Sequence, residues 1–524
     1  MKNILIAIRS IFKKGRHNVM KIVSLGIGLA VGLVLIAKVY FEQSYDDFYP
    51  DRDRVYQVWA KYQQNGGELK DYPQTSGGIA PTMQQQIPEI ETVTRYTSFG
   101  DWTFTMTDTK MKYSGRCIIA DSCFFDILPR PMLIGNAKEV LSTPMYVLVS
   151  SRIAKNIGGD VIGKNFTVDS SPGRTMTIGG VFEEVPENSH SRYDVIVSMA
   201  SAGRFMWEGS PTNMLGNDRY ISYVKLHKGV NPLALEEQVH TFVNSYFPPE
   251  EQQKTGFNIG FSFHELDGLH KELPQVKRMT WILSLLAFAL IFTAVMNYIL
   301  IVISSIVNRS KEVAVHKCYG ASENNIHGMM FGEALVHIVL SLILALLLIL
   351  AFRGTVEELL ATSLDSLLLS NGSLVLLGIC ILVFFVSGFM PGSLYARIPV
   401  ASAFRNYREN KRIWKKALLL VQFVATGFLV TMLVFVARQY TFMVNDRPGY
   451  AYENLAYCGL AGVDSTSRAK ILDEVMRLPG VVAATTVYQL PFEHASGNNI
   501  LLPGETQELF NIADLYWVCL LYTS

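Results

Sequence analysis

Five long apolar stretches alternate with polar stretches along the chain, and their lengths predict how it is organised. A helix of about 20 apolar residues crosses the hydrocarbon core of a bilayer, which is about 30 Å thick. The predicted spans are residues 19–40, 279–306, 334–352, 374–390 and 417–437. The hydrophobic pattern therefore predicts an α-helical transmembrane bundle.

The first span follows a short basic tail, residues 1–18, and a secretory signal peptide would begin in the same way. The apolar run is too long for such a peptide, and no small-x-small cleavage site follows it. We therefore expect an uncleaved span. Gly28 and Gly32 in this span form a GxxxG pair, which permits close packing of helices and is common in membrane helices of every function.

The stretch after the first span, residues 41–278, contains no further apolar run long enough to cross a membrane. The run Tyr146–Val149 predicts a buried strand, followed by a short helix that Ser150 or Ser151 caps and Gly158 stops. Other segments in this stretch alternate between strand-like and helix-like patterns. The predicted fold class is therefore a bundle of five spans with a large α+β extracytoplasmic domain.

The pattern begins again after the fifth span, in residues 438–524. The segment LPGVVAATTVY in this stretch is similar to IPEIETVTRY of the first insertion. This weak internal repeat predicts the start of a second extracytoplasmic domain. The ending WVCLLYTS gives no sign of a domain finish, so we expect a chain that is truncated at its C-terminus.

The basic residues predict the orientation of the spans. Lys and Arg gather in the tail 1–18 and in the loops 307–333 and 397–416, whereas the loop 353–373 is mainly acidic. The positive-inside rule places the basic segments in the cytoplasm and the insertion 41–278 outside. We therefore expect a multi-pass membrane protein with a cytoplasmic N-terminus.

Composition agrees with a membrane protein and limits the function classes. Charged residues make up 17% of the chain and the formal net charge is +1, so no basic field suggests binding of nucleic acid. Six cysteines are too few and too scattered for a disulfide framework. Cys117 and Cys123 lie near each other in the insertion, and the sequence leaves open whether they form a disulfide.

No motif for catalysis, metal binding or cofactor binding stands out. Residues 158–165, GGDVIGKN, lack the Ser or Thr of a phosphate-binding loop and lie between a predicted helix and a strand, in the wrong order for one. No HExxH, GxSxG or CxxC occurs, although a metal site built from distant residues stays open. No acidic or basic residue lies in the middle of a predicted span, which weakens a proton-driven carrier. The scattered histidines of the insertion are His190, His227, His240, His264 and His270.

The polar segment 308–322, NRSKEVAVHKCYGAS, is the part most suited to contact another protein. It predicts a short amphipathic helix, with Ala314, Val315, Cys318 and Tyr319 on one side and with polar residues on the other. Gly320 lies where a left-handed helix stop requires a glycine, and Ser322 could cap the helix that follows. The alternative is an ordinary juxtamembrane loop that contacts only lipid headgroups.

The same segment resembles the signature Arg-x-x-Glu-[Ile/Val]-[Gly/Ala]-[Ile/Val]-Arg-Lys-x-x-Gly-Ala of the MacB/FtsX-like ABC transporter permeases. His316 stands where Arg is usual, which puts one salt bridge in doubt. The resemblance implies a cytoplasmic coupling helix that docks on a separate ATP-binding subunit. The residues it assigns to this contact are Arg309, Glu312, Val313, Ala314, Val315, His316, Lys317, Gly320 and Ala321.

The insertion is similar to the MacB-like periplasmic core domain of the same family in the order of its segments. These are an FFDILP turn, a LIGNAKEVLSTP loop, the strand and helix of VLVSSRIAKNIGG, and the strand TIGGVFEEVPENSH. The rest of the chain is then an FtsX-like transmembrane domain. The resemblance implies a non-catalytic permease subunit, with ATP and magnesium on its partner, and a dimeric arrangement of permease units.

We expect this subunit to couple ATP hydrolysis to movement of the outer domain for export or extrusion of a substrate. Membrane lipids and a periplasmic or outer-membrane protein are further expected partners. One alternative is an FtsX-like regulator that activates a partner such as a cell-wall hydrolase, with no transport. A second alternative is a membrane receptor whose insertion binds a ligand. The sequence does not identify the cargo.

Overall fold

The computed structural model describes residues 17–64, 66–169, 171, 173–216, 218–369, 372–396, 400, 413–445, 454–460, 463, 465–487, 497–501 and 508–514. The chain divides into two compact units. The first consists of Met1–Asp101, Gly115–Gly163 and Thr177–Tyr450, and the second consists of Trp102–Ser114, Lys164–Met176 and Ala451–Ser524.

Within the described residues, five helices are long and apolar enough to cross a membrane. Each covers one of the apolar stretches of the sequence, and α12 begins well before the predicted start of its span at residue 334. The five helices are α2 (Asn18–Gln43), α10 (Pro274–Ser304), α12 (Glu323–Ala351), α15 (Ser373–Ala396) and α17 (Ile413–Asn445). In the described connections between them lie the shorter helices α11 (Ile306–Cys318), α13 (Arg353–Leu360) and α14 (Leu364–Leu368).

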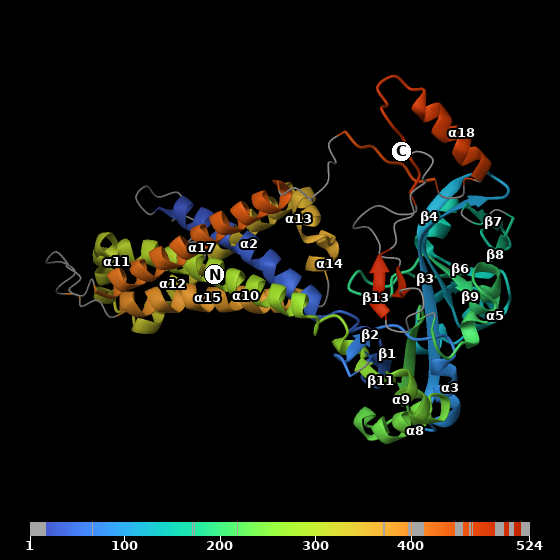
Figure 1. Cartoon of the computed structure of the whole chain (residues 1–524). Helices are drawn as coiled ribbons and strands as arrows, with labels where there is room; N and C mark the ends of the chain where they lie inside the picture. The colour runs from blue at the N-terminus through green and yellow to red at the C-terminus, as the bar shows by residue number, and fades with distance from the viewer. Residues whose placement is uncertain are drawn as a thin grey trace. The chain divides into compact units, whose positions relative to one another are not determined.

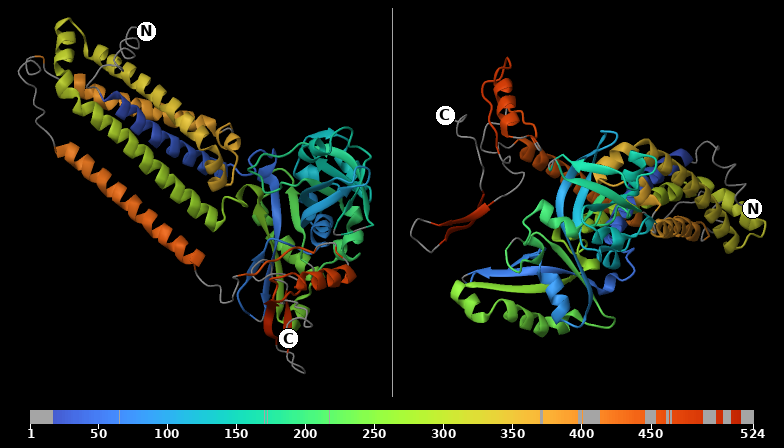
Figure 2. Two further views of the ribbon diagram at one scale, coloured as in Figure 1. Left: turned by 90° about the horizontal axis from the view of Figure 1, so that it is seen from above. Right: turned by 90° about the vertical axis from the view of Figure 1, so that its right-hand side faces the viewer.

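Helix α2 packs closely against α10 and α12, and Figures 1 and 2 show these helices side by side. A Cβ atom added at Gly28 would lie 2.3 Å from the Cβ of Ala294, and one added at Gly32 would lie 2.4 Å from Cγ1 of Ile291. Both partners belong to α10. The GxxxG pair therefore lies at the α2–α10 contact, where only glycine permits this separation.

The part of the chain between α2 and α10 contains one large mixed sheet, which we call the sheet domain together with its helices (Figure 1). Strand β1 runs antiparallel to both its neighbours, whereas β4 pairs in parallel with β9, and β6 in parallel with β8. The path across the sheet is β11 (Phe257–Glu265), β1 (Val55–Gln64), β10 (Ile221–Leu226), β3 (Ile90–Met106), β4 (Lys112–Ala120), β9 (Val195–Ser198), β6 (Tyr146–Ser150), β8 (Thr175–Phe182) and β5 (Met132–Ile134). Strand β2 (Lys70–Tyr72) extends the sheet beside β1.

Helices cover the sheet through two apolar cores. One core joins β1, β10 and β11 to α3 and α8 through residues such as Val58, Met83 and Phe242. The other joins β4, β6 and β9 to α4 and α5 through residues such as Phe124 and Leu148. The helices of the domain are α3 (Ile79–Gln86), α4 (Phe124–Ile127), α5 (Ala137–Ser142), α6 (Ser151–Ile157), α7 (Ala202–Phe205), α8 (Glu236–Tyr246) and α9 (Pro249–Thr255).

Two local predictions in this domain are confirmed. The buried strand expected at Tyr146–Val149 is β6, and the hydroxyl of Ser150 rather than that of Ser151 caps α6 by accepting from the N–H of Ile153 at 3.3 Å. Gly158 ends α6 with φ +75°, a left-handed value that favours glycine.

The described part of the second unit contains β7 (Asn165–Val168), which pairs with the Phe104–Met106 end of β3. It also contains α18 (Ser465–Met476) and the hairpin of β12 (Gly497–Leu501) and β13 (Glu508–Asp514). These elements do not establish a second α+β domain, so that expectation stays a prediction.

Candidate functional site

Helix α11 carries most of the predicted contact segment and continues α10 after a break of one residue. That residue is Ser305, whose backbone N–H bonds the carbonyls of Ile301 and Val302. Its buried hydroxyl donates to the carbonyl of Val302 at 2.6 Å. Because one hydrogen-bonded residue joins the two helices, a displacement of α11 would be passed directly to α10.

One face of α11 packs against the membrane helices. Ser310, Val313 and Ala314 are buried, and their spacing places them on one side of the helix. Val313 and Ala314 belong to the same apolar cluster as Ile303 of α10 and Ile326 of α12. Helix α11 contacts α10 and α15, and the same cluster includes Val383 of α15.

The opposite face of α11 is exposed, and it includes most of the side that the sequence pattern predicts as apolar. Val315, Cys318 and Tyr319 are exposed, and 89% of Tyr319 is accessible to solvent. Of the four apolar residues that the sequence pattern places on one side, only Ala314 is buried. Val313 and Ala314 pack into the bundle, whereas the side chains of Val315 and Tyr319 remain on the surface.

The structure places the other residues of the predicted contact at intermediate or exposed positions. Glu312, Lys317 and Ala321 are half-buried, and His316 is exposed. The side chain of Arg309 lies outside the described residues. Whether any of these residues contacts a partner stays a prediction.

The helix stop predicted after α11 is confirmed. Gly320 has φ +86°, and the N–H of Ala321 reaches back to the carbonyl of His316 at 3.0 Å. The N–H of Gly320 bonds the carbonyl of Lys317 at 3.0 Å, which completes a left-handed helix cap. Ser322 then caps α12 by accepting from the N–H of Asn325 at 3.3 Å, as predicted.

Replacing Gly320 by alanine is expected to destabilise the protein by about 1 kcal/mol, because an L-residue resists this left-handed backbone. The measurement is the thermal unfolding midpoint of the purified full chain. Gly354 supplies the control, since it lies inside α13 with no heavy atom near its missing Cβ. Alanine there should leave or raise the midpoint. A midpoint unchanged by Gly320→Ala would contradict the role of the cap.

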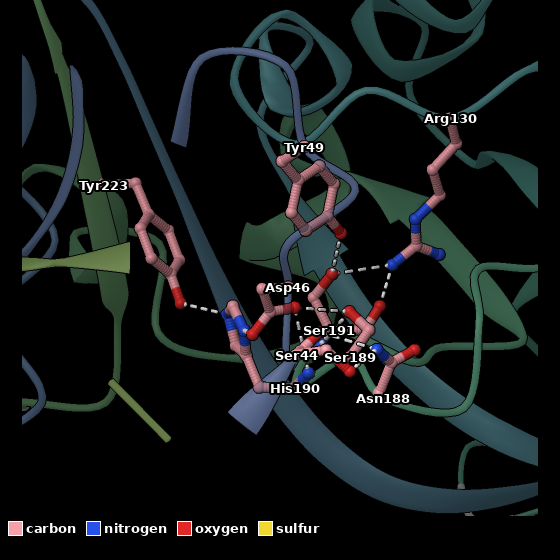
Figure 3. A network of polar contacts seen from close by, with 9 residues as sticks. All are labelled: Ser44, Asp46, Tyr49, Arg130, Asn188, Ser189, His190, Ser191 and Tyr223. Atoms are coloured by element: carbon pink, nitrogen blue, oxygen red, sulfur yellow. Dashed lines mark hydrogen bonds and ion pairs between the residues drawn. The ribbon is translucent and has the colours of Figure 1, made fainter. Parts of the chain in front are cut away.

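A second arrangement of polar residues lies where α2 meets the sheet domain (Figure 3). We call it the junction network, and it consists of Ser44, Asp46, Tyr49, Arg130, Asn188, Ser189, His190, Ser191 and Tyr223. Ser44, Asp46 and Tyr49 follow α2 directly, and the segment 188–191 belongs to the loop between β8 and β9. The network therefore ties the end of a membrane helix to the sheet.

Asp46 is the centre of the junction network. It is fully buried, and its left-handed backbone (φ +59°) is one that Asp tolerates better than most residues. Its N–H donates to the carbonyl of Asn188 at 2.8 Å. Its carboxylate accepts from the hydroxyl of Ser189 at 2.8 Å and from the N–H of His190 at 3.3 Å. These bonds satisfy a carboxylate that would otherwise be costly to bury.

The imidazole of His190 links Asp46 to the sheet. Its Nδ1 lies 2.6 Å from Oδ2 of Asp46, and its Nε2 lies 2.6 Å from the hydroxyl of Tyr223 in β10. Because a carboxylate accepts, Nδ1 carries a hydrogen and donates it. Burial raises the pKa of the Tyr223 hydroxyl well above its usual range, so this hydroxyl keeps its hydrogen.

Arg130 joins the network through Ser191. Its Nη2 donates to the carbonyl of Ser191 and, at 3.0 Å, to the hydroxyl of the same residue. That hydroxyl also bonds the hydroxyl of Tyr49 at 2.9 Å. The guanidinium carbon lies 5.2 Å from the ring centre of Phe182, so the cation also faces an aromatic ring. Burial lowers the pKa of Arg130, but an arginine starts so high that it keeps its charge.

A further group of charges joins α2 to two other segments. Lys38 bonds Glu42 at 2.7 Å within α2 and donates to the hydroxyl of Thr362 at 2.8 Å. The second carboxylate oxygen of Glu42 lies 2.5 Å from Nε2 of His270, just before α10. The ring of His270 in turn stacks on Tyr45 with ring centres 3.6 Å apart.

The hairpin between α13 and α14 also touches the sheet domain. The N–H of Ser363 donates to Oε2 of Glu187 at 2.9 Å. Glu187 immediately precedes the segment that holds Asp46. The loop 183–194 therefore contacts the end of α2 and the α13–α14 hairpin.

The contacts of this arrangement bind and position elements of the fold. Among the described residues, no group of three His, Cys, Asp or Glu side chains is placed to hold a metal ion. The glycine loop 158–165 follows α6 and leads into β7, in the predicted order. Cys117 and Cys123 are free thiols, and burial raises the pKa of the Cys117 thiol well above its usual range.

Sequence reasoning missed the junction network. The residues that Asp46 and Glu42 contact are 144 and 228 positions away, so no local spacing could pair them. The available signal was weak: Asp46 lies a few residues after the first predicted span, where a charged residue that becomes buried needs partners.

Two family models match the chain. Residues 20–242 match the MacB-like periplasmic core domain, and residues 284–400 match the FtsX-like permease C-terminal domain. No curated protein matches the chain.

Several solved structures of single domains or regions are similar to the chain. One is a domain described as part of a permease protein from Porphyromonas gingivalis, with 32% identity and a TM-score of 0.38, covering 41% of this chain and 91% of that one. The periplasmic region of MacB from Actinobacillus actinomycetemcomitans has 15% identity and a TM-score of 0.30, covering 42% and 92%. The extracellular domain of the noncanonic ABC-type transporter YknZ from Gram-positive bacteria has 10% identity and a TM-score of 0.28, covering 39% and 98%.

Proposed function

The chain belongs to the MacB/FtsX-like family of ABC transporter permeases, and from this premise we propose that it couples ATP hydrolysis by a separate subunit to movement of its sheet domain. Membership gives it a permease-type role and makes it a multi-pass membrane protein with an extracellular domain. The family works typically with a separate ATP-binding subunit and is usually non-catalytic itself. ATP and magnesium would accordingly lie on the partner.

The observation that carries the proposal is the construction of α11. Helix α11 packs on α10 and α15 with its buried face in the apolar core of the bundle, while Val315 and Tyr319 remain on the surface. Exposed aromatic and aliphatic side chains on a firmly held helix suit a protein contact. The segment would lie in the cytoplasm, as its basic residues and the positive-inside rule favour, and the bacterial inner membrane is the expected location.

Movement of α11 would reach the sheet domain by two routes. Helix α10 continues from α11 through Ser305 and begins just after His270, which bonds Glu42. Helix α2 packs along α10 and ends at the junction network, which holds the loop between β8 and β9. Closing of two ATP-binding subunits in a dimeric complex would in this way reshape the outer domain and drive export of a substrate.

The test uses the full chain, purified with its ATP-binding subunit in mild detergent. Val315→Ala combined with Tyr319→Ala should weaken binding of the ATP-binding subunit by about thirtyfold, because aromatic anchors at protein contacts contribute roughly 2 kcal/mol. The measurements are the subunit affinity and its ATPase rate with and without this chain. Glu312→Gln and Lys317→Gln should lower the stimulation of ATPase activity without unfolding the sheet domain.

Matched control residues lie away from α11, at the C-terminal end of α12 and in α13. Phe352 and Leu359 are exposed to a similar degree at the α12–α13 connection. Their alanine variants should leave subunit binding unchanged. Unchanged binding and stimulation in the α11 variants would contradict a coupling role. A cell-wall hydrolase that binds the sheet domain, with no substrate exported, would instead indicate a regulator.

A further inference from the structure

The loop between β8 and β9 forms a pocket with neighbouring strands. The pocket has a volume of about 170 Å³, which is enough for a phosphate-sized group. The polar and charged residues that line it are Arg116, Arg152, Glu184, Arg192, Tyr193 and Asp194. Three arginines and two carboxylates leave one net positive charge.

The two carboxylates of the pocket are already engaged by one arginine and by the backbone. Arg152 bonds Asp194 at 2.6 Å and lies 3.8 Å from Glu184. The second oxygen of Asp194 accepts from the backbone N–H of Arg116 at 2.8 Å. Within the part of the chain that the structure describes, neither carboxylate forms an ion pair with the guanidinium of Arg116 or Arg192. Both arginines are exposed, so their charge is available to an anion.

The pocket lies next to the ends of the membrane helices. Glu184 and Arg192 belong to the loop whose middle contacts Asp46 and Ser363. Burial raises the pKa of Tyr45, which follows α2 directly, and the positive charges of Arg192 and Arg116 oppose that rise. Both guanidinium groups are therefore within electrostatic range of a residue at the membrane boundary.

We propose that this pocket binds the phosphate group of an anionic lipid headgroup, with Arg116 and Arg192 as the binding residues. A guanidinium can donate two parallel hydrogen bonds to phosphate oxygens, which makes arginine suited to this ligand. A lipid presents its phosphate at the height of the helix ends, where the loop 183–194 lies. The inference goes beyond the coupling function, and it does not require an ATP-binding partner.

The experiment titrates the full chain, purified in a neutral detergent, with phosphatidylglycerol and separately with phosphatidylcholine of the same acyl chains. Native mass spectrometry counts the bound lipids. Arg116→Gln combined with Arg192→Gln should weaken phosphatidylglycerol binding about tenfold, as expected from loss of charge-assisted hydrogen bonds. Phosphatidylcholine, whose choline cancels the phosphate charge, should bind both proteins weakly and equally.

Arg204→Gln combined with Arg219→Gln is the matched control, because both side chains are exposed in the same domain. This control should bind phosphatidylglycerol as the unmodified protein does. Equal affinity of the Arg116 and Arg192 variant would overturn the site. A third titration adds inorganic phosphate as a competitor and should displace no lipid at a tenfold excess. Complete displacement by an equal concentration would show that free phosphate is the ligand and would overturn the lipid source.

Discussion

Replacing Asp46 by alanine is expected to lower the free energy of unfolding of the sheet domain by about 3 kcal/mol. The change removes the acceptor for the hydroxyl of Ser189 and for Nδ1 of His190, both of which lie in the junction network. Buried donors left without an acceptor lose the compensation for their desolvation. Alanine also resists the left-handed backbone at this position.

The measurement is urea unfolding of the full chain in lipid nanodiscs, followed by tryptophan fluorescence. Asp46→Asn separates the two causes, because Asn accepts the left-handed backbone and keeps one acceptor oxygen. It should lose less stability than the alanine variant. Asp126→Ala is the control, since that carboxylate is half-exposed and 3.9 Å from Lys138, and it should cost at most about 0.5 kcal/mol. Equal midpoints for Asp46→Ala and Asp126→Ala would contradict a central role of Asp46.

Local chemistry made much of the fold predictable. The apolar stretches lead to five long helices because a helix in lipid must satisfy its backbone internally, whatever its neighbours are. The cap at Ser150 and the stops at Gly158 and Gly320 depend on residues next to one another in the chain. The order of strands across the sheet could not be predicted in this way, since β1 pairs with β10 and β11 from the far end of the domain.

Only those parts of the candidate site that depend on residues close together in the sequence were predictable. The sequence of the segment 308–322 predicts helix α11 and its cap. It does not predict which side of the helix packs against the bundle. Ala314 and Val315 are adjacent apolar residues, and the packing of α11 on α10 and α15 decides that only Ala314 is buried. The junction network depends on pairs such as Asp46 and His190, whose separation in sequence leaves no periodic signal.

The membrane bundle contains a buried ion pair between Lys21 and Glu333, which the predicted span boundaries did not indicate. Glu333 lies one residue before the predicted third span, and in the structure it is inside α12 with 6% of its surface exposed. Lys21 of α2 is 1% exposed, and its Nζ lies 3.5 Å from Oε1 of Glu333. The hydroxyl of Ser341 in α12 also donates to the carbonyl of Ile22 at 3.1 Å. Polar contacts thus hold the start of α2 against the middle of α12.

Replacing Glu333 by alanine is expected to destabilise the full chain by about 3–5 kcal/mol, because the buried ammonium of Lys21 loses its countercharge. The measurement is the temperature at which the detergent-purified protein loses its monodisperse peak. A double variant, Lys21→Met with Glu333→Leu, removes both charges and should recover most of that loss, since apolar side chains of similar size suit the site. Glu323→Ala at the exposed first turn of α12 is the control and should change little. If the double variant is as unstable as Glu333→Ala, the carboxylate stabilises the bundle by a contact other than the one with Lys21.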